Sequence, residues 1–214
     1  GQSGEIIKTV RLDNFSNKDW ETMTQDDEYI YVGDIGNNSG DRKDLKIYKI
    51  SKQFSLTGED VVNAHAEQIK YSYSDQTVFD PRQYQHQFDC EAMFSHGEYL
   101  YLFTKDWIHF KTQVYKLTKE PGDYSIESIA DFDINGLVTG SDLSPNGKYF
   151  ALLGYTNSGL LSYNLRPFIY LFKFDFDRVF GDKAVLLDLQ SITGSQVEGI
   201  TFLNDSELII STEK

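Results

Sequence analysis

One sequence pattern occurs four times in this 214-residue chain and constrains its fold more than any other feature. Each copy has an acidic residue, a short apolar stretch, a polar turn and then an apolar run typical of a β-strand. Steps of 70, 51 and 56 residues separate the acidic positions Glu21, Glu91, Asp142 and Glu198. A unit of roughly 50 residues is within the range of β-propeller repeats. The copies read DWETMTQDDEYIYVGD from Asp19, DCEAMFSHGEYLYLFTKD from Asp89, GSDLSPNGKYFALLGY from Gly140 and VEGITFLNDSELIISTE from Val197.

Two further strand-like runs follow each of the first three copies. They are rich in Tyr, Phe, Ile, Val and Leu and are interrupted by Gly, Asn, Asp and Ser, which is typical of strands, and no amphipathic helical pattern stands out. Several runs, such as 29–32 and 99–103, are apolar throughout, as strands packed on both faces require. We therefore predict an all-β fold, a β-propeller of four-stranded antiparallel blades. The further runs cover 44–50, 112–117 and 168–176, then 68–73, 124–132 and 183–189.

The repeats predict a single domain across residues 1–214, with about four units visible. Residues 5–12 are expected to form a strand that completes a neighbouring blade, and the last unit holds only its first two strands. An open arc of blades exposes strand edges. We therefore expect an incomplete ring, either part of a longer natural chain or closed by pairing of the two ends. The units span about 19–75, 89–134, 139–190 and 197–214.

Composition excludes several classes of partner. A formal net charge of −13 argues against binding nucleic acid or an anionic membrane surface, and favours cations instead. The chain has no apolar stretch of the ~20 residues that a membrane span requires. It starts Gly-Gln-Ser-Gly, without Met, which indicates a processed or engineered start from which an export signal could have been removed. The single cysteine, Cys90, lies between two acidic residues that raise a thiol pKa, so we expect a buried, inert thiol.

These motifs resemble those of a known group. DWETMTQDDEYIYVGDIGNNSGDRKDLKIYKI, FDCEAMF with YLFTKDW, and VEGI with ISTE are similar to an uncharacterised β-propeller family of Bacteroidetes, over residues 5–213. Many members are exported or carried by type IX secretion substrates, so the resemblance implies an exported protein, periplasmic, cell-surface or extracellular. The acidic strand starts are more distantly similar to phytase-like and SdiA-regulated propellers. That resemblance implies calcium near the ring axis.

Propeller topology predicts that the acidic positions lie together. The residues that open each first strand and close each second strand gather at one mouth of the central channel. Clustered carboxylates need a cation or a raised pKa, and calcium accepts six to eight oxygen ligands in loose geometry. Alternatively, these acids cap backbone N–H groups. The predicted metal ligands are Glu21, Glu91, Asp142 and Glu198, with Ser141 in the matching column of the third unit.

A second set of residues closes the second strands and is expected to contact a ligand. The loop 34–42 has Asp and Asn oxygens that suit a hard cation, although Gly and Asn equally suit a tight turn. Arg42 is able to clamp a carboxylate or phosphate, or to pair with a neighbouring Asp. Trp107 either stacks on a sugar ring or packs under a blade. The predicted ligand-binding residues are Asp34, Asn37, Asn38, Arg42, Lys105, Asp106, Trp107 and Tyr155.

Three functions remain open at the level of sequence. The first is a binding or interaction module for a protein or carbohydrate, with a calcium site at the channel mouth. The second is a metal-assisted hydrolase of phosphate or sugar esters, in which Lys105 and Arg42 hold the anionic group. The third is a purely structural spacer. The chain has no GxSxG or HExxH motif and no paired Cys or His set with metal spacing, which favours a binding role over an enzyme.

Overall fold

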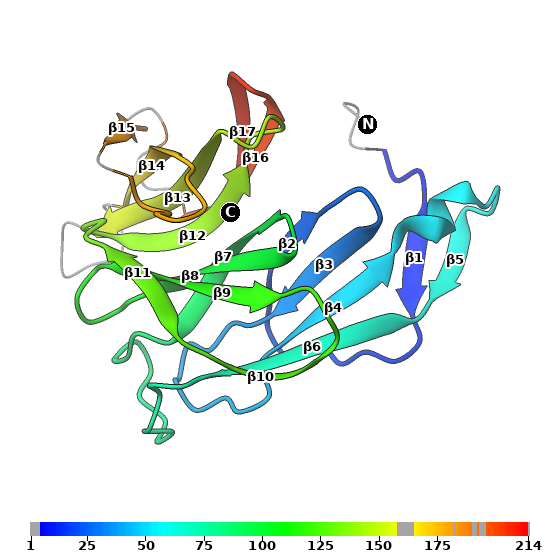
Figure 1. The fold of residues 1–214 in the computed structure, drawn as a ribbon, viewed down its shortest axis with the longest axis horizontal. Helices are drawn as coiled ribbons and strands as arrows, with labels where there is room; N and C mark the ends of the chain where they lie inside the picture. Colours follow the sequence, from blue (N-terminus) through cyan, green and yellow to red (C-terminus); the bar gives the residue numbers. More distant parts are fainter. Residues whose placement is uncertain (1–4, 158–164, 182, 190–191, 193–195, 214) are drawn as a thin grey trace.

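The computed structural model describes residues 5–157, 165–181, 183–189, 192 and 196–213, and in this part of the chain the fold is all-β (Figure 1). The described residues contain no α-helix, and η1 (Lys52–Leu56) is a short 3₁₀ turn. None of their helices is long and apolar enough to cross a membrane. The prediction of an all-β chain is confirmed. Parts of the third and fourth predicted units lie outside the described residues.

Four sheets follow one another along the chain, and neighbouring strands within each are antiparallel apart from one added edge strand. The first sheet contains β2 (Trp20–Gln25), β3 (Tyr29–Asp34), β4 (Lys46–Ser51) and β6 (Ala66–Tyr73). The second contains β7 (Asp89–His96), β8 (Tyr99–Lys105), β9 (Thr112–Thr118) and β11 (Ser128–Phe132). The third contains β12 (Leu137–Leu143), β13 (Tyr149–Asn157), β14 (Leu165–Lys173) and β15 (Ala184–Asp188), and the fourth is the hairpin of β16 (Gln196–Asn204) and β17 (Glu207–Glu213).

The first strands of consecutive sheets contact one another: β2 lies against β7, β7 against β12 and β12 against β16. The sheets therefore stand side by side, and Figure 1 shows them in succession from blue to red. Three apolar cores lie between neighbouring sheets, and a smaller fourth one packs residues of the first sheet against Leu12 and Ala64. The core between the second and third sheets is built of packed aromatic rings. The ring centre of Phe150 lies 4.8 Å from that of Phe172, on which it stacks, and 5.4 Å from that of Phe94, which is tilted against it. Wide aromatic side chains suit such flat interfaces because they bury large areas.

A β-bulge recurs at the same place in all four sheets. The register between the first and second strands shifts between Trp20 and Thr22, and at the corresponding place in the other three sheets. A bulge leaves one residue unpaired and changes the direction of its side chain. The four unpaired residues are Glu21, Glu91, Thr139 and Glu198.

Two predicted strands differ from the observed ones. The run 124–132 is split into β10 (Gly122–Ile126), which pairs in parallel with β6 of the first sheet, and β11, which pairs with β9. The reason is that its apolar side chains enter two cores, because Ile126 packs between the first and second sheets and Phe132 between the second and third. The N-terminal strand β1 (Thr9–Leu12) pairs in parallel with β5 (Val61–Ala64) in a separate two-stranded sheet.

The expected inert cysteine is observed. Cys90 is fully buried in the core between the first and second sheets, and its Sγ lies 3.4 Å from the carbonyl oxygen of Phe103. Burial, more than its acidic neighbours, raises the pKa of the Cys90 thiol well above its usual value. A thiol in this environment remains protonated and is a poor nucleophile.

Candidate functional site

Three of the four bulge residues are acidic, and with two aspartates that precede them they form the acidic cluster: Asp19, Glu21, Asp89, Glu91 and Glu198. The charges of Glu91, Asp19 and Asp89 all raise the pKa of Glu21, and that of Glu198 raises the pKa of Glu91. Glu21 and Glu91, 70 positions apart in the sequence, and Glu91 and Glu198, 107 positions apart, therefore lie within electrostatic reach of each other. The structure brings Glu21, Glu91 and Glu198 together.

Asp142 does not belong to this cluster. The structure places Thr139 at the bulge of the third sheet, so the alignment of Ser141 and Asp142 with Glu91 was wrong by two to three residues. Asp142 Oδ2 accepts hydrogen bonds from Thr201 Oγ1 (3.0 Å) and from the backbone N–H of Phe202 (2.8 Å). Its carboxylate fastens β16 to β12, which is the capping role considered as the alternative to metal binding.

Glu21 and Asp19 converge on Gly36, which follows β3. Oxygens of both carboxyl groups lie so near this glycine that a Cβ there would collide with Asp19 Oδ2 and Glu21 Oε1. Burial, and then the charges of Glu91, Asp19 and Asp89, raise the pKa of Glu21 to about 9. Among the described residues no Lys, Arg or His forms an ion pair with Asp19 or Glu21. The pair therefore holds a proton at neutral pH unless another cation replaces it.

Glu91 is neutralised from within its own sheet. Lys105 closes β8, and its Nζ lies 2.6 and 2.7 Å from the two carboxylate oxygens of Glu91 in a buried ion pair. Burial raises the pKa of Glu91 and Lys105 opposes that rise, while the Glu91 charge raises the pKa of Lys105 against the effect of burial. Tyr155 occupies the equivalent register position in β13 of the third sheet, and its ring centre lies 5.5 Å from Lys105 Nζ. Lys105 and Tyr155 therefore lie beside the acidic cluster, and a role for either in binding a ligand stays a prediction.

Asp89 is fully buried and has two fixed donors. The backbone N–H of Asn37 donates to its Oδ1 (2.7 Å), and the indole Nε1–H of Trp107 donates to its Oδ2 (3.0 Å). Trp107 also lies under Lys105, whose Nζ is 4.8 Å from the centre of its ring. Trp107 is therefore held in place by the acidic cluster. Its other ring contact is Tyr84, 4.4 Å away.

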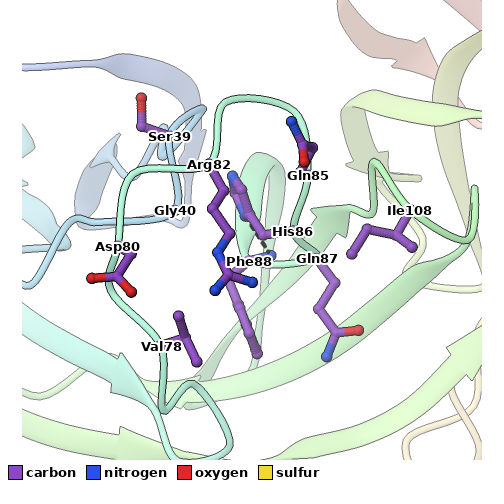
Figure 2. A pocket seen from close by; sticks show the side chains of 10 residues that line it. All are labelled: Ser39, Gly40, Val78, Asp80, Arg82, Gln85, His86, Gln87, Phe88 and Ile108. Carbon is purple, nitrogen blue, oxygen red and sulfur yellow. Dashed lines mark hydrogen bonds between the residues drawn. The ribbon is translucent and has the colours of Figure 1, made fainter.

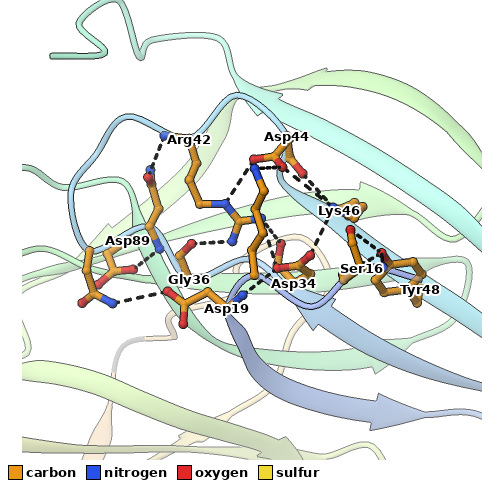
Figure 3. A network of polar contacts seen from close by, with 12 residues as sticks. Ser16, Asp19, Asp34, Gly36, Arg42, Asp44, Lys46, Tyr48 and Asp89 are labelled. Carbon is orange, nitrogen blue, oxygen red and sulfur yellow. Dashed lines mark hydrogen bonds and ion pairs between the residues drawn. The ribbon is translucent and has the colours of Figure 1, made fainter. Parts of the chain in front are cut away.

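Most of the loop 34–42 has a structural role (Figure 3). Arg42 donates to the carbonyl oxygen of Gly36 (2.7 Å) and pairs with Asp34 (3.1 Å) and Asp44 (3.2 Å). Asp34 is fully buried and also pairs with Lys46 (3.1 Å). Burial opposes ionisation of Asp34, but the N–H of Asp19 and the two cations hold its pKa below the usual value. Of the two roles considered for Arg42, clamping a ligand or pairing with a neighbouring Asp, these contacts correspond to the pairing.

The remaining predicted ligand residues also have contacts within the chain. The Asn37 side chain accepts from Arg42 N (3.0 Å) and donates to the Phe88 carbonyl (3.0 Å). Asn38 Nδ2 lies 3.4 Å from Asp19 Oδ2, at the rim of the acidic cluster. Asp106 caps its own turn, since it accepts from the backbone N–H groups of residues 108 and 109 at 2.9 and 3.0 Å. Whether any of these residues binds a ligand stays a prediction.

Sequence reasoning missed two positions. In the sequence Gly36 has only the features of a turn residue, but in the structure it allows the close approach of Asp19 and Glu21. In the third sheet Thr139 occupies the bulge position that a glutamate occupies in the other three. Its Oγ1 donates a hydrogen bond of 2.6 Å to the carbonyl oxygen of Val197 in the fourth sheet. Thr139 lies in the strand-like run LVTG, but this run contains no acidic residue that would mark the bulge position in the sequence.

The described residues contain no group of three or more His, Cys, Asp or Glu side chains arranged to hold a metal ion. The acidic cluster as it stands therefore offers two converging carboxyl groups, on Asp19 and Glu21, and further carboxylates around them. No family model matches the chain, and a search of curated proteins finds none with significant similarity to it.

Proposed function

We propose that the four sheets are blades of a β-propeller and that the domain is a binding module whose acidic cluster takes up a cation, calcium in the first instance. Support for the propeller comes from the succession β2, β7, β12 and β16 along one side of all four sheets, with the same bulge in each. Repetition of one irregular feature is expected of a repeat protein.

The observation that carries the cation site is the Asp19–Glu21 pair. Its two carboxyl groups converge on Gly36 without a basic partner among the described residues, and Glu21 has a pKa of about 9. Burial and the three neighbouring acids that raise this pKa disfavour the charged form of Glu21, and a bound cation would favour it. A divalent cation compensates two carboxylates at once, so it competes with the proton for this position.

The available groups suit calcium better than a transition metal. They are carboxylate oxygens, which calcium prefers, whereas transition metals favour nitrogen and sulfur ligands. Asp19 and Glu21 would hold the ion, with Glu198 as a further carboxylate, whereas Glu91 remains paired with Lys105. Bound calcium would supply charge neutralisation between the first strands. Because the ligands are not preassembled, we expect an affinity typical of extracellular calcium modules, with a Kd of about 10⁻⁴ to 10⁻³ M.

The geometry does not favour a hydrolase of phosphate or sugar esters. That function requires basic groups able to hold an anion near the acids. Arg42 is engaged by Asp34, Asp44 and the Gly36 carbonyl, and Lys105 is engaged by Glu91. A structural spacer would differ from a binding module in one observable property. In a spacer Glu21 would stay protonated when calcium is added, and calcium would not bind.

Isothermal titration calorimetry with calcium tests the proposal. Wild type should bind calcium, Glu21→Gln should bind it at least tenfold more weakly, and the exposed control Glu28→Gln should match wild type within twofold. The heat should also vary with the ionisation enthalpy of the buffer, because Glu21 must release its proton when calcium binds. Absence of binding by wild type at millimolar calcium would remove the cation site and leave the spacer.

A further inference from the structure

A cavity of about 170 Å³, here called the loop pocket, lies between three loops (Figure 2). Its walls come from residues 39–40, from the long segment 78–88 that joins the first and second sheets, and from Ile108. An apolar protein cavity of about 150 Å³ is large enough to bind benzene. The loop pocket therefore has room for one six-membered ring or a short branched chain.

The walls of the loop pocket are fixed by hydrogen bonds, although they are loops. Arg82 N donates to the Ser39 carbonyl (2.8 Å), and Gln76 Nε2 donates to the Gly40 carbonyl (2.8 Å). His86 is buried and joins the two loops: its Nδ1 accepts from Phe88 N (3.1 Å), so its Nε2 carries the proton and donates to the Asn38 carbonyl (3.0 Å). A site built on a fixed backbone binds without a large ordering penalty.

The floor of the loop pocket is apolar and partly exposed. Phe88 packs on the core through Tyr73, at 5.4 Å between ring centres, and also lines the pocket. Val78 and Ile108 line it too, with 47% and 51% of their surfaces exposed. Exposed apolar side chains that face one concave space mark a binding site more often than scattered ones do. These three side chains suit a ring or a branched hydrocarbon.

Arg82 supplies a charge to this apolar pocket. Figure 2 shows its side chain directed from the loop towards Phe88. Among the described residues Arg82 has no side-chain hydrogen bond or ion pair, although Asp80 lines the same pocket. A guanidinium group binds a carboxylate through two parallel N–H···O bonds. The nearby Asp80 disfavours a second negative charge, and therefore a phosphate dianion.

We infer that the loop pocket binds a small monocarboxylic acid with an apolar body, such as an aromatic or branched-chain acid. The carboxylate is held by Arg82 and the body contacts Val78, Phe88 and Ile108. The side chains of Gln85 and Gln87 also line the pocket. This site is separate from the acidic cluster and does not depend on the proposed cation site.

Benzoate is the probe, and the methyl NMR signals of Val78 and Ile108 are the readout. In wild type these signals should shift saturably with benzoate. Arg82→Gln should weaken binding at least tenfold, Arg82→Lys should weaken it less, and the exposed control Arg11→Gln should stay within twofold of wild type. Benzyl alcohol, which has the ring without the charge, should bind at least tenfold more weakly than benzoate.

Several results would overturn the inference. They are equal affinity of wild type for benzoate and benzyl alcohol, unchanged benzoate affinity in Arg82→Gln, or benzoate shifts that leave Val78 and Ile108 unaffected. Calcium titration of Arg82→Gln separates the two sites, because it should match wild type whether or not the loop pocket binds benzoate. A changed calcium affinity in Arg82→Gln would contradict the independence of the two sites.

Discussion

At the scale of single residues, Glu21 is the clearest sign of unbalanced charge. Its carboxyl group has an ordinary pKa of 4.5 and a folded-state pKa raised to about 9 by burial and by three neighbouring acids. The folded protein therefore binds a proton that the unfolded chain releases between these values. Without calcium, this contribution to stability is fully present below pH 4.5 and is lost as the pH rises through 9.

Glu21→Gln removes this dependence, because glutamine does not titrate. In the presence of a chelator, we expect the free energy of unfolding of wild type to fall between pH 5 and 9 more steeply than that of Glu21→Gln. Urea unfolding at several pH values measures it, with the exposed Glu28→Gln as a control that keeps the wild-type slope. Equal slopes in wild type and Glu21→Gln would show that Glu21 titrates normally.

Gly36 is the second residue with a specific consequence. A Cβ at this position would meet oxygens of both Asp19 and Glu21, so Gly36→Ala must push the two carboxyl groups apart. We expect a loss of about 1–3 kcal/mol in the free energy of unfolding, the usual effect of overpacking. Gly58→Ala is the matched control, since a Cβ there has nothing within 4 Å. Similar losses in both variants would mean that Gly36 is not tightly packed.

At the scale of strands and sheets, the apolar runs predicted most strands but not their exact register. Runs such as 99–103 are strand-like whatever follows them, because both faces are buried. A bulge adds one residue that no hydrophobic period reveals, and in the third sheet Thr139 provides no acid to mark it. The acidic Asp142 was therefore aligned with Glu91 instead. Likewise, the split of 124–132 depends on which core receives each side chain, which a single sequence does not show.

Asp142 now has a testable role as a fastening between sheets. Asp142→Ala removes the acceptor for Thr201 Oγ1 and for the N–H of Phe202, which leaves these donors without their partner. We expect a loss of about 1–3 kcal/mol in stability, and no change in calcium affinity. Thermal unfolding and calcium calorimetry on the same variant measure both effects. Reduced calcium affinity would restore Asp142 as a ligand.

Asp26 joins the first and second sheets. Its Oδ2 pairs with Lys119 (2.8 Å) and accepts from the Tyr31 hydroxyl (2.8 Å), and although burial opposes it, these contacts lower the pKa of Asp26 to about 2. Its contribution to stability is therefore present above its ordinary pKa of 3.8 and is lost as the pH falls towards 2. We expect Asp26→Asn to lose about 1–2 kcal/mol at pH 7 and less at pH 3.

Chemical denaturation at both pH values measures this difference. Asp27→Asn is the control, because Asp27 is an exposed neighbour and should leave stability within about 0.5 kcal/mol of wild type. An equal loss of stability for Asp26→Asn at pH 7 and pH 3 would contradict the claim that the ionised Asp26 carboxylate stabilises the contact between the first and second sheets.

At the scale of the whole molecule, side-by-side sheets explain how acids far apart in the sequence meet. The four first strands contact one another in turn, and each presents its bulge residue at the same level. The repeat in the sequence predicted this meeting of Glu21, Glu91 and Glu198. The repeat did not predict that Glu91 pairs with Lys105 while Asp19 and Glu21 converge on Gly36 without a basic partner among the described residues. These contacts depend on side chains from different strands, which a single sequence does not show.

The pKa of Glu21, measured by ¹³C NMR of its carboxyl group with and without calcium, tests the central claim most directly. We predict a value well above 4.5 without calcium, near 9, and a large decrease when calcium is added. A Glu21 signal that titrates near 4.5 and does not respond to calcium would contradict both the uncompensated pair and the cation site.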